Sequence, residues 1–281
     1  MNERISGQTL TERVGVEPVN DHNFPLLITA TIRPHAGQIG RLLDPVTRRR
    51  QYAEALRSLA ARSCGIKEFV FCENSGEPFP EFPSIQELFS RKDLVLHFFQ
   101  EQLSSPDKIP GKGWGEGWLI RRVLETNPVL RRARAFFKLT GRYEVVNLKA
   151  VVACIGRAYS DPTAHPVFVC QSYLMTSRGP YVDSQFFWSQ TEFYKQNLID
   201  VYTKVDDHGG VYLEHAIASG LHALAGQCRI GVLPFTIILK GVSGHSGELV
   251  TNRGQRFRMM VSNITRKKSG ITYLAPLCTD C

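Results

Sequence analysis

The chain has 281 residues, of which 43% are hydrophobic, enough for the core of one large α/β domain or two small ones. Its longest apolar runs, Phe24–Ala30 and Gly231–Leu239, are far too short to span a bilayer, and the polar start lacks the apolar region of a secretory signal. Seven scattered cysteines argue against a disulfide framework. We therefore expect a cytoplasmic protein.

The formal charge of +8 is concentrated in short basic runs. A basic protein meets nucleic acid, anionic lipid or phosphorylated ligands. The runs lack interleaved aromatic residues and any helix-turn-helix signal, so we expect no nucleic-acid partner. Each run is also explained as a solvated helix face, and together they suit peripheral contact with the acidic cytoplasmic face of the inner membrane. The runs are Arg48–Arg50, Arg121–Arg122, Arg131–Arg134 and Arg266–Lys268.

The first half of the chain alternates strand and helix, as a nucleotide-binding sheet does. Phe24–Ile32 is a continuous apolar run that predicts a buried strand, and Thr47–Ser63 has apolar residues at helical spacing. Glu68–Cys72 and Leu94–Phe99 predict further strands, with a short helix at Ile85–Phe89 between them.

The stretch Gly111–Tyr143 predicts a glycine-rich loop, a helix over Glu116–Ala135 and an apolar strand over Ala135–Leu139. The strand runs into the polar turn Thr140–Arg142. Loop, helix, strand and turn in this order suit an α/β sheet whose ligand lies at the carboxyl edge of the strands.

The loop itself carries the residue types that approach a phosphate. Gly111, Gly113 and Gly115 let the backbone come close to a ligand, and Lys112 can face a phosphate. The GKS or GKT ending of a Walker loop is missing, and no strand leads into a dinucleotide fingerprint. A flexible surface loop before a helix is the alternative.

After Tyr143 the pattern changes. Val145–Ile155 and His165–Leu174 predict strands, Glu192–Val205 and Val211–Ala225 predict helices, and Gly231–Leu239 predicts a buried strand. An aromatic cluster lies between them, which is either core or a stacking platform for a sugar or lipid. Its members are Tyr181, Phe186, Phe187, Trp188, Phe193 and Tyr194.

Five segments, taken in order, resemble bacterial GT-A glycosyltransferases that build lipopolysaccharide, O-antigen or capsule. They are GKGWGE, FFKLTGRY, VDSQFFW, YLEH and GVSGHSG. The resemblance implies a nucleotide-sugar donor, a glycan or lipid-linked acceptor, and an α/β fold with a Rossmann-type mixed sheet flanked by helices. It places one domain at 23–250, with a nucleotide-sugar half (23–143) and an acceptor half (144–250). A loosely ordered N-terminus (1–22) and a basic tail (251–281) flank it.

The resemblance also implies where the donor binds. The first strand's end and the loop after the second strand would meet the base and ribose, and the GKGWGE loop would lie beside the donor sugar and phosphates. The implied residues are Thr31, Arg33, Glu73, Asn74, Lys112, Gly113, Gly115, Glu116, Lys138 and Arg142.

The family's metal motif, Asp-x-Asp, is missing at the expected strand end, where this chain has Thr140-Gly141-Arg142. A requirement for Mn²⁺ or Mg²⁺ is therefore left open. Arg142 or Lys138 would neutralise the leaving diphosphate in place of a metal. The adjacent acids Asp206 and Asp207 lie in a later turn.

Inverting sugar transfer needs a carboxylate that takes the proton of the acceptor hydroxyl. The family places it at the start of a helix, and Glu214 in YLEH matches, with Asp183 as the next candidate. An acid in the first turn of a helix also stabilises the helix dipole without further role. Trp188, His215 and His245 are the candidates for acceptor binding.

Two other functions stay open at this point. A nucleotidyltransferase also uses a glycine-rich loop and a lysine, but it requires a pair of metal-binding acids that the sequence does not offer at clear spacing. A basic module that binds nucleic acid or a membrane surface explains the charge, but not the GKGWGE and YLEH segments.

Overall fold

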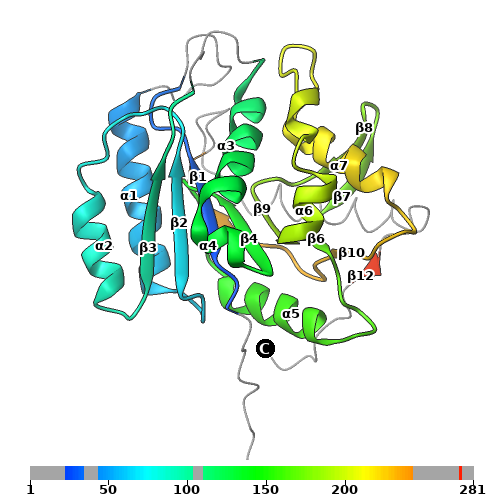
Figure 1. The fold of residues 1–281 in the computed structure, drawn as a ribbon, viewed down its shortest axis with the longest axis horizontal. Helices are drawn as coiled ribbons and strands as arrows, with labels where there is room; N and C mark the ends of the chain where they lie inside the picture. Colours follow the sequence, from blue (N-terminus) through cyan, green and yellow to red (C-terminus); the bar gives the residue numbers. More distant parts are fainter. Residues whose placement is uncertain (1–22, 35–43, 104–109, 243–271, 274–281) are drawn as a thin grey trace, which may run out of the picture.

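The computed structural model describes residues 23–34, 44–103, 110–242 and 272–273 (Figure 1). The predictions for the N-terminus 1–22, for His245 and for the Arg266–Lys268 run fall outside these residues, as does all but residues 272–273 of the basic tail 251–281. Within the described residues, no helix has the length and apolar character needed to cross a membrane.

The described residues build a central sheet of eight strands in the order β12-β10-β6-β9-β4-β1-β2-β3. Every neighbouring pair is parallel except the two that involve β9. The strands are β1 (Leu26–Ala30), β2 (Glu68–Glu73), β3 (Val95–Gln100), β4 (Ala135–Thr140), β6 (Phe168–Cys170), β9 (Phe186–Gln190), β10 (Ile230–Val232) and β12 (Thr272–Tyr273). The predicted α/β class, with a Rossmann-type mixed sheet flanked by helices, is confirmed.

Helices cover both faces of the sheet (Figure 1). One buried apolar cluster packs α1, α2 and α5 on one face, and a second packs α3, α4, α6 and α7 on the other. Alternate residues of β1 face the two clusters, Leu26 and Ile28 to the first and Leu27 to the second, as the two-residue period of a strand requires. The helices are α1 (Pro45–Ala61), α2 (Phe82–Ser90), α3 (Lys112–Thr126), α4 (Pro128–Arg132), α5 (Leu148–Ser160), α6 (Thr191–Asn197) and α7 (Leu213–Ala223).

Smaller elements join these. A short 3₁₀ helix, η2 (Val201–Lys204), precedes α7. Two antiparallel pairs stand apart from the main sheet. They are β5 (Glu144–Val145) with β11 (Leu239–Lys240), and β7 (Tyr173–Thr176) with β8 (Gly179–Val182).

The strand predicted at Val145–Ile155 is wrong beyond its first residue: Val145 belongs to β5, and the segment from Leu148 onward forms α5. Leu148, Val151, Val152 and Ile155 are buried at the spacing of one helix face. The β-branched valines favour a strand locally, but the apolar period of the whole segment, together with packing on the sheet, favours a helix.

Three other boundaries differ from the predicted ones. The helix predicted at Glu116–Ala135 begins at Lys112 and divides at Asn127, whose side chain accepts hydrogen bonds from the first backbone N–H groups of α4. The helix predicted at Glu192–Val205 is α6 followed by η2. The strand predicted at Gly231–Leu239 pairs only at its two ends, since Pro234 between them has no N–H to donate.

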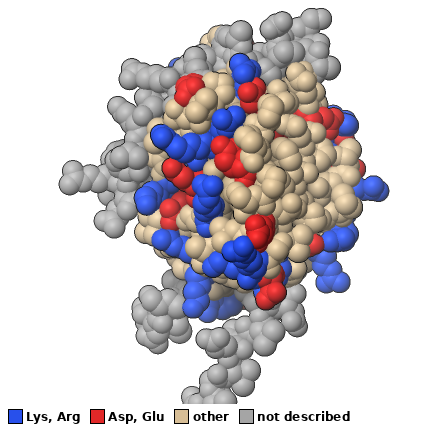
Figure 2. All heavy atoms as spheres, turned by 90° about the vertical axis from the view of Figure 1, so that its left-hand side faces the viewer, with Lys and Arg blue, Asp and Glu red and all other residues tan. Residues whose placement is uncertain are grey.

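Acidic and basic side chains are intermingled on the face of the molecule that carries α1 and α2 (Figure 2). Arg49 pairs with Glu81 at 3.3 Å, and Arg50 lies 4.0 Å from Glu54. Arg48, the first member of this run, is buried instead of exposed. The solvated helix face expected for the Arg48–Arg50 run therefore describes Arg50, whereas Arg49 is half-buried.

Candidate functional site

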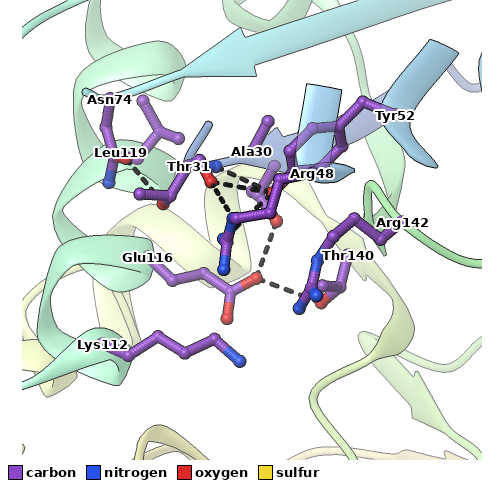
Figure 3. A pocket seen from close by; sticks show the side chains of 11 residues that line it. Ala30, Thr31, Arg48, Tyr52, Asn74, Lys112, Glu116, Leu119, Thr140 and Arg142 are labelled. Carbon is purple, nitrogen blue, oxygen red and sulfur yellow. Dashed lines mark hydrogen bonds between the residues drawn. The ribbon is translucent and has the colours of Figure 1, made fainter. Parts of the chain in front are cut away.

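A pocket opens at the topological switch point of the sheet (Figure 3). From β1 the chain adds β2 and then β3 on one side, and returns to place β4 on the other side of β1. Ligands of open α/β sheets bind in the crevice that such a reversal leaves at the carboxyl ends of the strands. The lining residues are Thr29, Ala30, Thr31, Arg48, Tyr52, Asn74, Lys112, Glu116, Leu119, Thr140 and Arg142.

The pocket lining carries three cations and one carboxylate, Glu116. Arg48 reaches it from α1, where its Nε donates to the Thr31 carbonyl at 2.7 Å. Arg142 follows β4 and is 3% exposed, with a buried Nε that has no hydrogen-bond partner. Lys112 is the first residue of α3, so its backbone adds the positive end of a helix.

None of the ion pairs between described residues involves Lys112 or Arg142. Burial lowers the pKa of the Lys112 ammonium group, while the nearby Glu116 carboxylate raises it. Cations gathered in a partly enclosed pocket without matching acids create a positive potential. The pocket is therefore suited to an anionic ligand.

Glu116 is held in one orientation from the pocket wall. Its Oε1 accepts hydrogen bonds from Thr29 Oγ1 at 2.6 Å, Lys138 Nζ at 2.7 Å and Thr140 Oγ1 at 3.1 Å. Burial acts to raise the pKa of Glu116, but the ammonium groups of Lys138 and Lys112 outweigh it and lower the pKa to about 2. The carboxylate is thus ionised at neutral pH.

A second carboxylate, Glu214, is hydrogen-bonded to the residues that precede the antiparallel strand β9, and these residues lie beside the carboxyl end of β4. Among them, Ser184 accepts a hydrogen bond from Lys138 Nζ at its carbonyl, at 2.7 Å. Its hydroxyl donates to Glu214 Oε1, also at 2.7 Å. Glu214 lies in the first turn of α7, and burial raises its pKa. A carboxyl group with a raised pKa is suited to take a proton near neutral pH.

Five of the predicted donor residues line one pocket, and two of these bond to each other. Thr31 Oγ1 donates to Asn74 Oδ1 at 2.7 Å, and Asn74 Nδ2 donates to the Gly115 carbonyl at 3.1 Å. These bonds tie the end of β1, the loop after β2 and the first turn of α3 together. The five are Thr31, Asn74, Lys112, Glu116 and Arg142.

Three predicted donor residues do not line the pocket. Arg33 is exposed and pairs with Glu77 at 2.6 Å. Glu73 is fully buried, and its carboxylate accepts hydrogen bonds from the backbone N–H groups of Ile32, which follows β1, and of Ser75 and Gly76, in the loop after β2. Lys138 is fully buried behind Glu116.

The two predicted glycines are packed against side chains of the protein. A Cβ at Gly113 would lie 3.1 Å from Leu213 at the start of α7, and one at Gly115 would lie 3.5 Å from Asn74. Gly113 therefore permits close packing of α3 against α7. The predicted GKGWGE loop is itself the first turn of α3, where the Gly113 N–H donates to the Asp207 carboxylate at 3.4 Å.

Trp188 is in the core, and the stacking-platform alternative is wrong for this residue. The ring is fully buried, with Phe24 and Tyr159 each 5.5 Å away between centroids. It has no face open to a ligand. His215 lies outside the pocket lining and stacks on Tyr212 at 5.6 Å.

Asp183 is buried and also lies outside the pocket lining. Its Oδ1 accepts a hydrogen bond from the Gln185 N–H at 3.0 Å. This bond shapes the turn that leads into β9, on which the position of Ser184 depends.

Five polar residues of the site were not predicted from the sequence: Thr29, Arg48, Tyr52, Thr140 and Ser184. One signal could have found Arg48. It lies four residues before Tyr52 and eight before Leu56, so it shares the buried face of α1. An arginine on a buried helix face is unusual unless it contacts polar groups, and such a position indicates a site.

The lining does not fit a divalent cation, because its single carboxylate already pairs with Lys138 and three cations surround it. Asp206 Oδ1 accepts from the backbone N–H groups of His208 and Gly209, and Asp207 caps α3. Within the described part of the chain, no cluster of three or more His, Cys, Asp or Glu residues is placed to hold a metal ion.

No family model matches the chain, and no curated protein matches its sequence. Among solved structures, the galactosyltransferase LgtC aligns with a TM-score of 0.47 and 10% identity, over 70% of each chain. The mannosyltransferase Ktr4p from S. cerevisiae aligns with a TM-score of 0.42 and 9% identity, over 73% of this chain and 67% of Ktr4p.

The bifunctional glycosyltransferase WbbM aligns with a TM-score of 0.40 and 9% identity, over 67% of this chain and 35% of WbbM. The chain thus spans about a third of the length of WbbM. Because these TM-scores are all below 0.5, the case for function rests on the geometry of the chain itself.

Proposed function

We propose that this chain is a glycosyltransferase that moves a sugar from a nucleotide-sugar donor to a glycan or lipid-linked acceptor in the synthesis of bacterial surface polysaccharide. The observation that carries the proposal is the positive pocket at the switch point of the sheet, where neither Lys112 nor Arg142 forms an ion pair with a described residue. A diphosphate is the anion that such a pair of cations would neutralise.

The hydrogen bonding of Glu116 favours a donor that carries hydroxyl groups in addition to a diphosphate. Its Oε1 has three hydrogen bonds, whereas no described residue bonds to its second oxygen (Figure 3). An ionised oxygen held in a pocket accepts hydrogen bonds from hydroxyls strongly. A nucleotide-sugar offers both parts, a diphosphate for Lys112 and Arg142 and ring hydroxyls for Glu116.

The proposed reaction is a single displacement with inversion. Glu214 takes the proton of the acceptor hydroxyl, the acceptor oxygen bonds to the anomeric carbon, and the bond from that carbon to the diphosphate oxygen breaks. The electron pair leaves with the nucleoside diphosphate, whose charge Lys112 and Arg142 neutralise. The raised pKa of Glu214 and its position at the same edge of the sheet support this role.

We also propose that the protein acts in the cytoplasm, with peripheral contact to the inner membrane. The formal charge of +8 supports attraction to acidic lipid. Flotation with vesicles of phosphatidylglycerol, against vesicles of phosphatidylcholine, tests this part alone.

Transfer is tested by incubating the protein with UDP-, GDP- and CMP-linked sugars and measuring release of the free nucleotide, with and without lipid-linked glycan acceptors. We expect release from one nucleotide class and an increase with acceptor. Pyrophosphate formed from a nucleoside triphosphate and a sugar phosphate would instead favour the nucleotidyltransferase alternative. No release from any donor would contradict the proposed function.

A further inference from the structure

Lys138 is a fully buried lysine whose three N–H donors all have partners. Its ammonium group lies 2.7 Å from Glu116 Oε1, 2.7 Å from the Ser184 carbonyl and 3.0 Å from Thr140 Oγ1. A buried ammonium group is costly unless it is paired and fully hydrogen-bonded, and here it is both. The lysine does not line the pocket, so the proposed chemistry gives it no direct contact with the ligand.

Two of the three partners of Lys138, Glu116 and Ser184, belong to different parts of the site. Glu116 lines the pocket from α3. Ser184 precedes β9, and its hydroxyl donates to Glu214 at 2.7 Å. A continuous chain of contacts, Glu116 to Lys138 to Ser184 to Glu214, thus joins the pocket lining to the first turn of α7.

Of the three hydrogen bonds that Lys138 donates, only the one to Glu116 is needed to neutralise the Glu116 carboxylate. The bond from Lys138 to the Ser184 carbonyl does something else, because it fixes the backbone of the residue whose hydroxyl orients Glu214. Displacement of a reacting group by about 1 Å can cost on the order of a hundredfold in rate.

We propose that Lys138 is a positioning residue for sugar transfer, which holds Ser184 in place and through it aligns the Glu214 carboxylate with the ligand in the pocket. This inference rests on the proposed function. It assigns to one buried lysine the coupling between the pocket and the proton acceptor.

The experiment is a double-mutant cycle on kcat with Lys138→Met and Ser184→Ala. Both single variants should lower kcat by about ten- to a hundredfold, with the dissociation constant of the nucleoside diphosphate changed less than about threefold in Ser184→Ala. If Lys138 acts through Ser184, the double variant should be no slower than the slower single variant. Ser160→Ala is the matched control, because this serine ends α5, lies outside the pocket lining and donates to the Gly156 carbonyl at 2.9 Å.

The pH profile of kcat separates positioning from a purely structural role. Three neighbouring side chains change the pKa of Glu214. The hydrogen bond from Ser184 and the ammonium group of Lys112 lower this pKa, whereas the carboxylate of Glu116 raises it. Loss of the Ser184 bond should therefore move the acidic limb of the profile to higher pH. We expect this displacement in Ser184→Ala and equally in Lys138→Met.

Because Lys138→Met leaves Glu116 buried without its partner, the variant Lys138→Met/Glu116→Gln is measured beside it and keeps the test usable if the single variant fails to fold. Additive losses in the cycle, or an acidic limb that stays in place, would overturn the positioning role while leaving the proposed function intact. Wild-type protein that releases no nucleotide from any donor would contradict both.

Discussion

Protonation of Glu116 should destabilise the folded protein, because this carboxylate forms a buried ion pair with Lys138. Burial acts to raise the pKa of Glu116, but Lys138 and Lys112 lower it from the ordinary 4.5 to about 2. A carboxyl group with a lower pKa in the folded than in the unfolded state stabilises the protein above its unfolded pKa. That stability is lost as the pH falls from about 4.5 toward about 2.

The size of the effect follows from the two pKa values. A difference of about 2.5 corresponds to about 3 kcal/mol of unfolding free energy, and about 2 kcal/mol of this is lost between pH 6 and pH 3. Urea unfolding at the two pH values measures it. The reference is Glu116→Gln/Lys138→Met, which lacks both charges and keeps similar side-chain volumes.

Wild-type protein should lose about 2 kcal/mol more than this reference between pH 6 and pH 3, since the other carboxylates titrate in both proteins. Equal losses in the two proteins would show that Glu116 has the same pKa in the folded and unfolded states, and that its ion pair with Lys138 does not stabilise the fold in this pH range.

Four further predictions concern individual parts of the site. Lys112→Ala should weaken binding of a nucleoside diphosphate by at least about tenfold in calorimetry, whereas Arg131→Ala, on the exposed side of α4, should not change it. Glu214→Gln should lower turnover by about 10²–10⁴ with donor binding nearly unchanged; a fully active variant would remove it as the base. Gly113→Val should lower the melting temperature, since overpacking against Leu213 costs about 1–3 kcal/mol, and an unchanged melting curve would contradict that packing. Transfer should survive EDTA at least in part, and complete loss restored by Mn²⁺ would show that metal ligands exist.

The fold was predictable where the apolar period and the chain breaks agree. The apolar runs Leu26–Ile28 and Phe69–Cys72 lie in β1 and β2, where the sequence predicts strands. α5 was missed because two adjacent valines favour a strand locally, whereas the spacing of its buried residues is helical. The spacing of apolar residues over the whole segment thus indicates the correct element, whereas the local strand propensity of the valines does not.

The site was predictable only where the residue type itself indicates chemistry beside a strand end. Lys112, Glu116 and Arg142 fit that description and line the pocket. Ser184 does not, because its place depends on β9 running antiparallel between β4 and β6, which no local pattern specifies. Glu73 also follows this pattern in the sequence, but its carboxylate accepts hydrogen bonds from the backbone N–H groups of Ile32 and Ser75 and does not line the pocket.

We propose above all that the pocket at the end of β1 and β4 binds a nucleotide through Lys112 and Arg142, neither of which forms an ion pair with a described residue. Isothermal titration of the wild-type protein with UDP, GDP and CMP tests it most directly, with Arg142→Ala as the matched variant. We expect one of the three nucleotides to bind and Arg142→Ala to weaken its binding by at least about tenfold. Absence of binding for all three, or equal binding by wild type and Arg142→Ala, would show that this pocket does not bind a nucleotide through Arg142.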